Sequence, residues 1–438
     1  MRGRGRSNAG NHIATENKSS SRPSALQDSL YTIKTYKDFR YLWVGNFFTV
    51  GAQWLQVLTV GWLVLELTEG NALLTGSVVG IRTLPVFITG PLAGVLADRL
   101  DRRKIVMITQ GSMACAAGLF ALLVISTDIQ SDPIQGPLEW WHAFIYMGIA
   151  GVAHSIIQPV RQAMVANTVP REALTSALAL TGMAHPSMRI AGPAIGGLLI
   201  ATLGFNWNFF LEALAYFAIV LLMVPVKLPY RQTKQAEHTS PFKSMAEGVN
   251  YVLHEKRILQ LIVMSFIPNF VFQPLAFVLP VFTTEVLHRG PGSGGLLAAA
   301  IGMGGIIAAI IIASMGYFVR KGLATLLGMT GGCIFILAFA NSTWFIASLV
   351  LLAGMGFCQY IFRVGNSTLL QIIVPDDLRG RVMSIYFLDN GFTPLATFLI
   401  SLLVHIWNPS GAFTVIGGVS VILALIQCIT FKQARDLD

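Results

Sequence analysis

The sequence has few charged residues, which make up 12% of its 438 positions. Soluble proteins carry about 25% charged residues, so this chain lacks the charge to cover a water-exposed surface. Hydrophobic residues make up 54%, and apolar runs recur along almost the whole chain. A run of about 20 apolar residues is long enough to cross the hydrocarbon core of a bilayer. The composition therefore excludes a soluble globular protein and indicates an all-α integral membrane protein.

Cysteine is also scarce, and the four cysteines are not arranged for chemistry. They fall inside apolar runs without C-x-x-C spacing, at Cys115, Cys333, Cys358 and Cys428. This pattern predicts neither a disulfide framework nor a metal site. The chain also has no Walker A loop, no H-E-x-x-H and no G-x-S-x-G elbow. We therefore expect no cofactor, no metal and no enzymatic activity, with an intramembrane enzyme as a less favoured alternative.

About twelve apolar runs are expected to form transmembrane helices, because unpaired backbone groups are too costly in lipid for any other structure. In the first half they cover residues 41–67, 73–97, 104–126, 140–167, 173–203 and 206–226. In the second half they cover residues 258–287, 292–319, 322–340, 343–373, 381–406 and 410–431.

Polar stretches divide the chain into five predicted parts. The first is rich in Ser, Asn, Arg and Gly and has too few large apolar residues to form a core, so it should be disordered. The parts are a cytoplasmic tail (1–36), a six-helix half (37–226), a cytoplasmic linker (227–257), a second six-helix half (258–432) and a short tail (433–438).

The basic residues predict the orientation. Of the 30 Lys and Arg residues, 25 fall in the tails, the linker and the loops of one side, and only Arg289 falls in a loop of the other. The positive-inside rule then places both termini in the cytoplasm, in the cell or inner membrane. The net charge of +9 does not indicate nucleic-acid binding, because the cations lie between apolar spans and form no single basic face.

The loop after the second span combines a small residue, an acid and several cations. In GPLAGVLADRLDRRK, Gly94 and Asp98 lie four residues apart on one helical face, followed by Arg99, Arg102 and Arg103. A carboxylate here could bind the positive N-terminus of a neighbouring helix and act as a breakable gating latch. Alternatively, the cations only fix the topology.

This loop resembles the signature loop between helices two and three of the major facilitator superfamily, with Asp101 at the place of a usual glycine. The form DRLDRR is similar to that of the enterobactin-exporter and macrolide-efflux group, which comprises drug:proton antiporters. A short internal repeat around Pro170 and Pro375 fits two parallel halves. The resemblance implies the major facilitator fold, a substrate cavity between the halves and alternating access.

The fifth span, HPSMRIAGPAIGGLL, carries residues that kink a helix and permit close packing, namely Gly192, Pro193, Gly196 and Gly197. GPxxGG also resembles the end of an antiporter signature, although simple helix packing explains it equally well. Arg189 of this span lies near mid-membrane, where an unpaired cation costs at least about 2.5 kcal/mol, so it should face protein or water.

Other polar residues within spans are candidates for the substrate cavity. Together with Arg189 they are His154, Asn269, Gln273, Gln359 and Tyr360. A buried histidine is more often structural than functional. Arg161 and Arg363 are expected near the cytoplasmic exits, where long side chains reach the membrane surface.

Three residues are candidates for proton coupling: Asp389, Arg82 and Glu212. Burial favours the neutral form of a carboxyl group and a nearby arginine favours the anion, so alternating partners could load and release a proton. A static pair of Arg82 with Asp389 is the alternative.

The sequence thus predicts a secondary-active exporter of small amphipathic molecules, a drug or a siderophore-like metabolite, working by proton antiport. Its partners are then the small-molecule substrate, protons and the lipid bilayer. A proton-coupled uptake symporter and a receptor without transport activity remain alternatives. No feature of the sequence specifies the substrate or an oligomer.

Overall fold

In the computed structural model the chain is almost entirely helical. The structure describes residues 31–86, 89, 100–129, 131, 133–228, 241–315, 320–375, 378, 381–383, 385, 386 and 389–435. Ten of the described helices are long and apolar enough to cross a membrane, and two shorter apolar helices, α3 and α16, accompany them. An integral membrane protein of two six-helix halves is confirmed.

The first half is built from α2 (Lys37–Leu67) to α9. Most helices between them begin close to the predicted residues, but α3 ends at Ile81 within the predicted span 73–97, and the fifth predicted span is divided into α7 and α8. The helices after α2 are α3 (Ala72–Ile81), α5 (Arg102–Ile125), α6 (Trp140–Thr168), η1 (Arg171–Ala173), α7 (Leu174–Gly182), α8 (Ala184–Leu203) and α9 (Phe205–Met223).

The second half begins after a separate amphipathic helix of the linker, α10 (Pro241–His254). Its helices are α11 (Lys256–Glu285), α12 (Pro291–Met315), α13 (Lys321–Ala340), α14 (Phe345–Ile373), η2 (Asp389–Phe392), α16 (Thr393–Ile406), α17 (Pro409–Thr430) and α18 (Lys432–Arg435).

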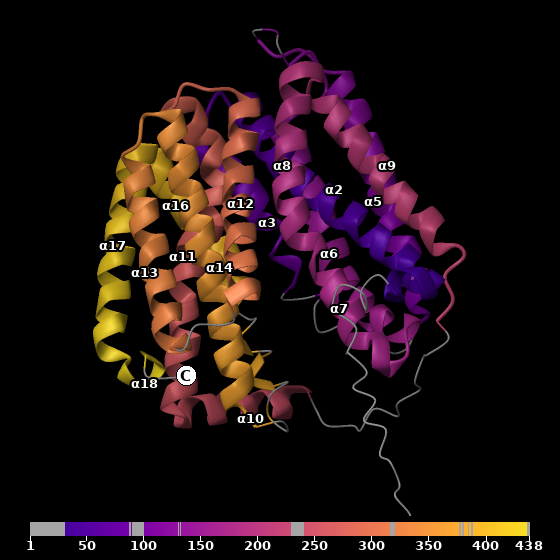
Figure 1. The fold of residues 1–438 in the computed structure, drawn as a ribbon. Coiled ribbons are helices and arrows are strands. Elements are labelled where there is room, and N and C mark those ends of the chain that lie inside the picture. The colour runs from indigo at the N-terminus through magenta and orange to yellow at the C-terminus, as the bar shows by residue number, and fades with distance from the viewer. Residues whose placement is uncertain are drawn as a thin grey trace, which may run out of the picture.

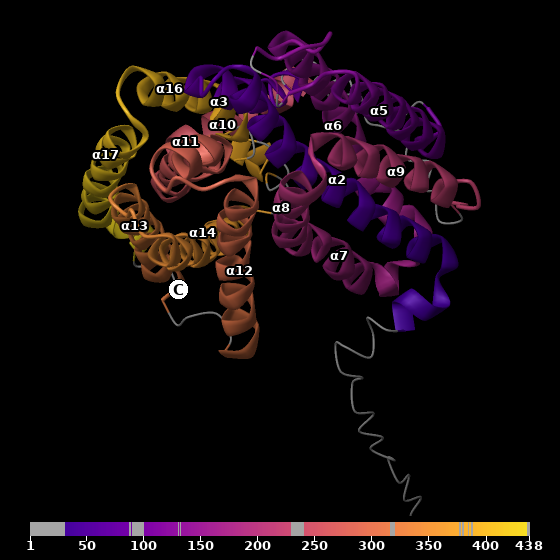
Figure 2. The same cartoon turned by 90° about the horizontal axis from the view of Figure 1, so that it is seen from above.

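The two halves form two groups of helices that lie side by side (Figure 2). The groups lie close at one end and diverge toward the other (Figure 1). We name the diverging end the linker end, because α10 and α18 lie there (Figure 1). The most extensive contacts between the halves are made by α8 with α12 and by α3 with α16, and α11 also contacts α2 and α3. The α8–α12 contact runs from Gly197 and Gly295 near the opposite end to Ile190 and Gly302.

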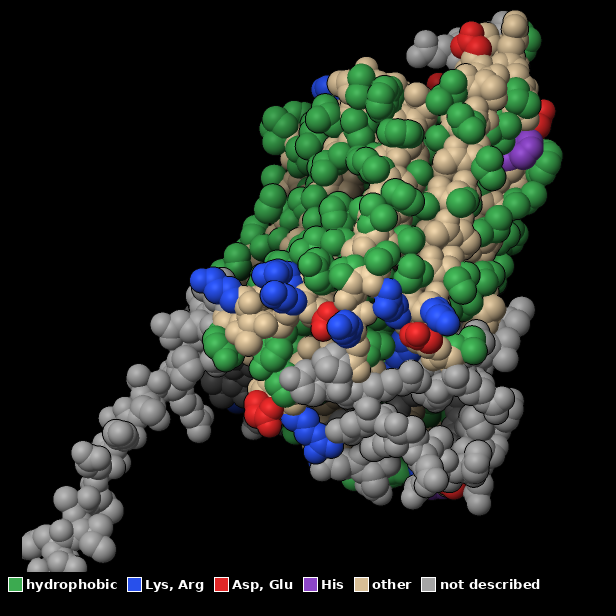
Figure 3. Space-filling view, turned by 90° about the vertical axis from the view of Figure 1, so that its right-hand side faces the viewer, with side chains coloured by type: hydrophobic (Ala, Val, Ile, Leu, Met, Phe, Trp, Pro, Cys, Tyr) green, Lys and Arg blue, Asp and Glu red, His purple; other side chains and the backbone are tan. Residues whose placement is uncertain are grey.

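Each half has its own apolar core, and apolar side chains also cover the outside. Phe282, Phe339 and Phe413 pack together in the second half, with ring centroids 4.3 and 6.1 Å from Phe282. Figure 3 shows apolar side chains over the body of the first half and Lys and Arg gathered along its linker-end margin. An apolar belt with a basic margin fits a bilayer and its headgroups.

Two local features differ from the sequence expectations. Residues 31–35, expected within the disordered tail, are helical, and Thr32 is buried. The fifth span breaks between Gly182 and Ala184, ahead of Pro186, which lies in the first turn of α8. Proline is tolerated in a first helical turn because the N–H groups there have no partner within the helix.

The linker helix α10 is held against the second half by an ion pair. Glu247 on α10 accepts a hydrogen bond from Arg381 at 2.5 Å, and both side chains are partly exposed. A Cβ added at Gly248 would lie 3.1 Å from Ile385 and from the Cβ of Arg381, so the helix approaches this segment closely. The linker therefore contacts the second half directly.

Candidate functional site

A cavity of about 390 Å³ lies between the two halves. Its lining extends from Gly302 and Gly305 in the middle of α12 to Tyr386, in the segment held to α10 at the linker end. From the first half it takes Gly182, His185, Pro186 and Arg189, and from the second half also Gln359, Tyr360, Arg363, Val364, Ser367 and Thr368. Both halves therefore build the site.

Arg189 is the cationic group of the first half that reaches across this cavity. It donates a hydrogen bond to Oε1 of Gln359 at 2.8 Å. Its guanidinium also lies over the ring of Trp54, with Cζ 5.6 Å from the ring centroid. His185, one turn earlier on α8, packs edge-on against the same ring at 5.6 Å. Trp54 thus positions two basic side chains at the wall of the cavity.

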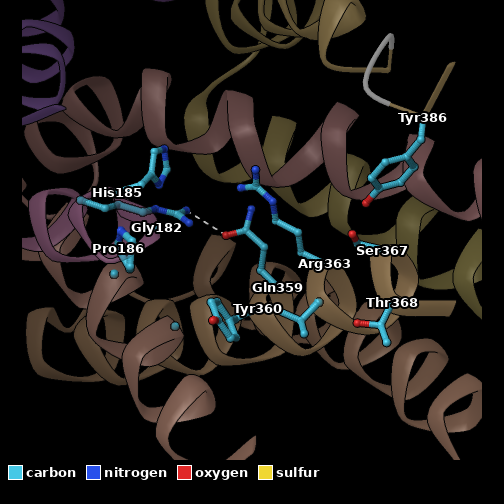
Figure 4. A pocket seen from close by; sticks show the side chains of 13 residues that line it. Gly182, His185, Pro186, Gln359, Tyr360, Arg363, Ser367, Thr368 and Tyr386 are labelled. Carbon is cyan, nitrogen blue, oxygen red and sulfur yellow. Dashed lines mark hydrogen bonds between the residues drawn. The ribbon is translucent and has the colours of Figure 1, made fainter. Parts of the chain in front are cut away.

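The second half contributes a polar stripe on α14. Gln359, Arg363 and Ser367 lie four residues apart, so they share one helical face. Figure 4 shows Arg363 extending beside Gln359, with Tyr360 and Thr368 on the same side of the cavity and Tyr386 on a separate segment. The Arg363 side chain is exposed, and in this position its exposure is to the cavity. The position of Arg363 is therefore explained by the cavity and not by contact with the membrane surface.

A second polar group lies wholly inside the first half, around Glu212 of α9. Glu212 is 1% exposed, and its Oε1 accepts hydrogen bonds from Gln56 Nε2 and from the Tyr146 hydroxyl, both at 2.7 Å. Among the described residues, its Oε2 has no hydrogen-bond partner. Three helices, α2, α6 and α9, thus hold a carboxyl group with one oxygen fixed and the other unpaired.

Arg82 and His154 form a neighbouring contact in the same half. The Arg82 guanidinium approaches Nδ1 of His154 at 3.4 Å and the carbonyl oxygen of Gln53 at 3.5 Å. The carbonyl of Arg82 also lies directly beside Gly151, where a Cβ would overlap it. Arg82 therefore bonds within its own half, whereas the sequence suggested a partner in the other.

The predicted residues fall into three groups. Arg189, Gln359 and Tyr360 line the cavity, whereas His154, Asn269 and Gln273 do not belong to its lining in the part of the chain that is described. Gly94, Asp98 and Arg99 of the predicted latch lie outside the described residues. Arg102 begins α5, and Arg103 bonds the carbonyl oxygen of Val224. Asp389 was predicted inside the span 381–406, but in the structure it begins the short helix η2. Its side chain is not among those described.

The glycines predicted for close packing lie where α8 meets its neighbours. A Cβ at Gly192 would come within 2.7 Å of the Cβ of Trp54. A Cβ at Gly197 would lie 2.6 Å from the Pro291 oxygen and 2.9 Å from the Cα of Gly295 on α12. Gly196 packs on Leu58, and Pro193 presents its carbonyl to Gly295. Only a residue without a side chain fits the α8–α12 contact at Gly197.

Several residues of the site were not among the predicted ones. Arg363 was assigned to the membrane surface, but the four-residue spacing of Gln359, Arg363 and Ser367 is a signal that favours one shared face. No sequence pattern indicated Gln56 or Tyr146, because each is a single polar residue in a different span. Only the tertiary packing brings them to Glu212.

The fold and the cavity between its halves define a transporter of the major facilitator type. The family model described as transmembrane secretion effector matches residues 31–428, so the chain belongs to this family of the major facilitator superfamily. The chain is therefore a transporter and not an enzyme.

Known relatives agree with this assignment. The chain is 24% identical to the staphyloferrin A transporter of Staphylococcus aureus over 88% of this chain and 94% of the relative. It is 25% identical to the enterobactin exporter EntS of Shigella flexneri over 92% and 96%. Its fold is similar to those of the nucleoside transporter NupG (TM-score 0.73, 12% identity, 90% of this chain and 100% of that one) and a D-xylose–proton symporter (0.68, 16%, 90% and 97%).

Proposed function

We propose that the protein is a secondary-active exporter of small amphipathic molecules, a drug or a siderophore-like metabolite, which it exchanges for protons. The observation that carries this proposal is the cavity lined by both halves, with Arg189 of α8 bonded to Gln359 of α14 across it. A site shared by two halves changes its access when the halves rock against each other. The name of one relative, the enterobactin exporter, supports export.

Alternating access fits the distribution of contacts between the halves. At the end opposite the linker, α8 packs on α12 and α3 packs on α16, whereas the cavity extends toward the linker end. We place the protein in a cell or inner membrane, with the termini and the linker on the cytoplasmic side. A cavity that extends toward the linker end then admits a substrate from the cytoplasm. The hairpin of Gly94, Asp98, Arg99, Arg102 and Arg103 is our proposed latch for the reverse state.

Glu212 is the proton carrier that the contacts favour. A carboxyl group buried among three helices is unfavourable in its charged form. The neutral form keeps the two hydrogen bonds that Oε1 accepts and adds one proton. Its unpaired Oε2 is the atom on which a proton would sit. Two further candidates for proton coupling remain. They are Arg82, which contacts His154 in the same half, and Asp389 of η2.

Reconstitution in liposomes tests this function. The purified protein is given a pH-sensitive dye inside the vesicles, an imposed proton gradient and a panel of amphipathic acids, amines and neutral compounds. We expect substrate-dependent proton movement and depletion of labelled substrate from the linker side. Accumulation in the direction of proton flow would establish uptake by symport instead, and absence of flux for every compound would refute transport of this class.

Glu212→Gln separates coupling from folding. Glutamine keeps one carbonyl oxygen for Gln56 and Tyr146 and loses the atom that carries the proton, so folding is expected to survive while proton movement stops. Glu247→Gln makes the same change on the exposed linker helix and serves as the control. Asp389→Asn is measured alongside. Full proton coupling in Glu212→Gln would remove Glu212 from the mechanism.

A further inference from the structure

The cavity between the halves carries positive charge without a matching acid. Its described lining contains Arg189 and Arg363 and no Asp or Glu. Each of these two arginines lies on a transmembrane helix, where a cation without a counterion is expensive. The lining therefore lacks the negative charge that would balance it.

The partners of the arginines are neutral. Arg189 is held by the amide oxygen of Gln359 at 2.8 Å and by the ring of Trp54. Arg161 of α6 donates in the same way to the amide oxygen of Gln158 at 2.7 Å. An amide oxygen orients a guanidinium but leaves its full positive charge in place. These arginines are thus positioned without being neutralised.

Arg363 lines the same cavity as Arg189 but comes from the other half, and the two cations repel each other. Such repulsion opposes closure of the cavity when no ligand is bound. An oxyanion between them would convert the repulsion into two attractions, because guanidinium groups bind carboxylates and similar oxyanions with charge-assisted hydrogen bonds. The hydroxyls of Ser367 and Thr368 lie further along the same wall as additional donors.

We propose that the cavity binds an anion that carries at least two carboxylate groups. One group binds Arg189 in place of Gln359, and the second binds Arg363, so that the ligand bridges the halves. This inference rests on the proposed transport function and narrows its substrate to acidic molecules. Amphipathic cations are excluded by the same charges. The volume of about 390 Å³ suits a small polyacid.

Direct binding to the full-length protein in nanodiscs tests the proposal. The probes are citrate as the polyanion, trimethyl citrate as its neutral counterpart, and tetraphenylphosphonium as a cation. We expect citrate to bind, with an affinity that falls as salt is raised, and trimethyl citrate to bind at least tenfold more weakly. Equal or tighter binding of tetraphenylphosphonium than of citrate would overturn the proposal.

Three variants locate the site. Arg189→Gln and Arg363→Gln should each weaken citrate binding at least tenfold, and Arg363→Lys should recover part of the loss because it restores the charge. Arg289→Gln removes one positive charge at the opposite end, where Arg289 lies over Phe345, and should leave binding unchanged. Equal loss in Arg289→Gln would assign the effect to overall charge and overturn the site. Thermal unfolding of each variant confirms that it is folded.

Gln359→Leu tests the displacement step. If the anion replaces Gln359 at Arg189, removal of this competing acceptor should leave citrate binding intact or tighten it. A loss as large as that of Arg189→Gln would show that Gln359 is itself a ligand and overturn the displacement.

The binding and flux measurements fail independently. Flux of amines with no anion binding would overturn the acidic substrate class and leave the transporter proposal standing. Anion binding that Arg189→Gln and Arg363→Gln abolish, with no flux of any compound, would support the site and refute the transport proposal.

Discussion

Arg189 of α8 donates a hydrogen bond to Oε1 of Gln359 of α14 at 2.8 Å, and this bond joins the two halves across the cavity. Gln359 lies in the middle of α14 and Arg189 lies in the second turn of α8, and both residues line the cavity. The bond therefore spans the site at the depth where a substrate would be held. Its replacement by substrate contacts would link binding to the relative position of the halves.

The first prediction concerns the hydrogen bonds of Glu212. Tyr146→Phe and Gln56→Leu each remove one bond to Oε1, and Gln56 and Glu212 are fully buried. Loss of a buried hydrogen bond of this kind costs about 1 to 3 kcal/mol. We therefore expect a lower thermal unfolding temperature in detergent for both variants. An unfolding temperature equal to that of the wild type would show that the Glu212 cluster does not stabilise the first half.

The second prediction concerns the ion pair of Glu247 with Arg381. Both side chains are partly exposed, by 46% and 33%, and exposed ion pairs contribute at most about 1 kcal/mol. Glu247→Gln should therefore change the unfolding temperature much less than Tyr146→Phe does. Any effect should disappear in high salt, because salt screens exposed charges. A large loss of stability that persists in high salt would contradict this interpretation and assign α10 a larger role.

The third prediction concerns Trp54, which contacts both Arg189 and His185. Trp54→Leu keeps an apolar side chain and removes the ring over which the guanidinium lies. A contact of this type is worth about 0.5 to 2 kcal/mol, and more where water is excluded. We expect weaker substrate binding with an unchanged proton response of Glu212. Trp54→Phe should restore part of the affinity, and failure of phenylalanine to do so would place the effect in packing.

Much of the fold could be predicted from the sequence, because lipid imposes one rule on every segment. Apolar runs of about 20 residues must be helices, and α5, α6 and α13 begin and end within two residues of the predicted spans. A kink was predicted within HPSMRIAGPAIGGLL, but the break falls just before this stretch, between Gly182 and Ala184, and Pro186 lies in the first turn of α8. Local proline signals give the region of a break and leave its position open by a few residues.

The site was harder to predict, because its residues meet only in three dimensions. Arg189 and Gln359 were identified singly as polar residues in apolar spans, and their hydrogen bond joins positions 170 residues apart. Arg363 was misplaced because a basic residue near a span end can either reach the surface or face a cavity. The Gln56, Tyr146 and Glu212 contact depends on the rotation of three helices, which apolar composition does not determine.

The last prediction concerns the contact of α8 with α12 at the closed end. A side chain at Gly197 would meet backbone atoms of Pro291 and Gly295, and backbone cannot move aside as a flexible side chain can. Gly197→Val should therefore separate α8 from α12 and disfavour the state that is closed at this end. We expect increased labelling of a cysteine introduced at Ser293 by a membrane-impermeant thiol reagent, together with slower transport.

Gly418→Val is the matched control, because a Cβ at Gly418 on α17 has no atom within 4 Å. This variant should label and transport as the wild type does. The two variants carry the same glycine-to-valine change and differ only in whether another helix packs against the glycine. If Gly197→Val kept wild-type labelling and flux, the close approach of α8 and α12 would not control access, and the closed end would depend on the α3–α16 contact instead.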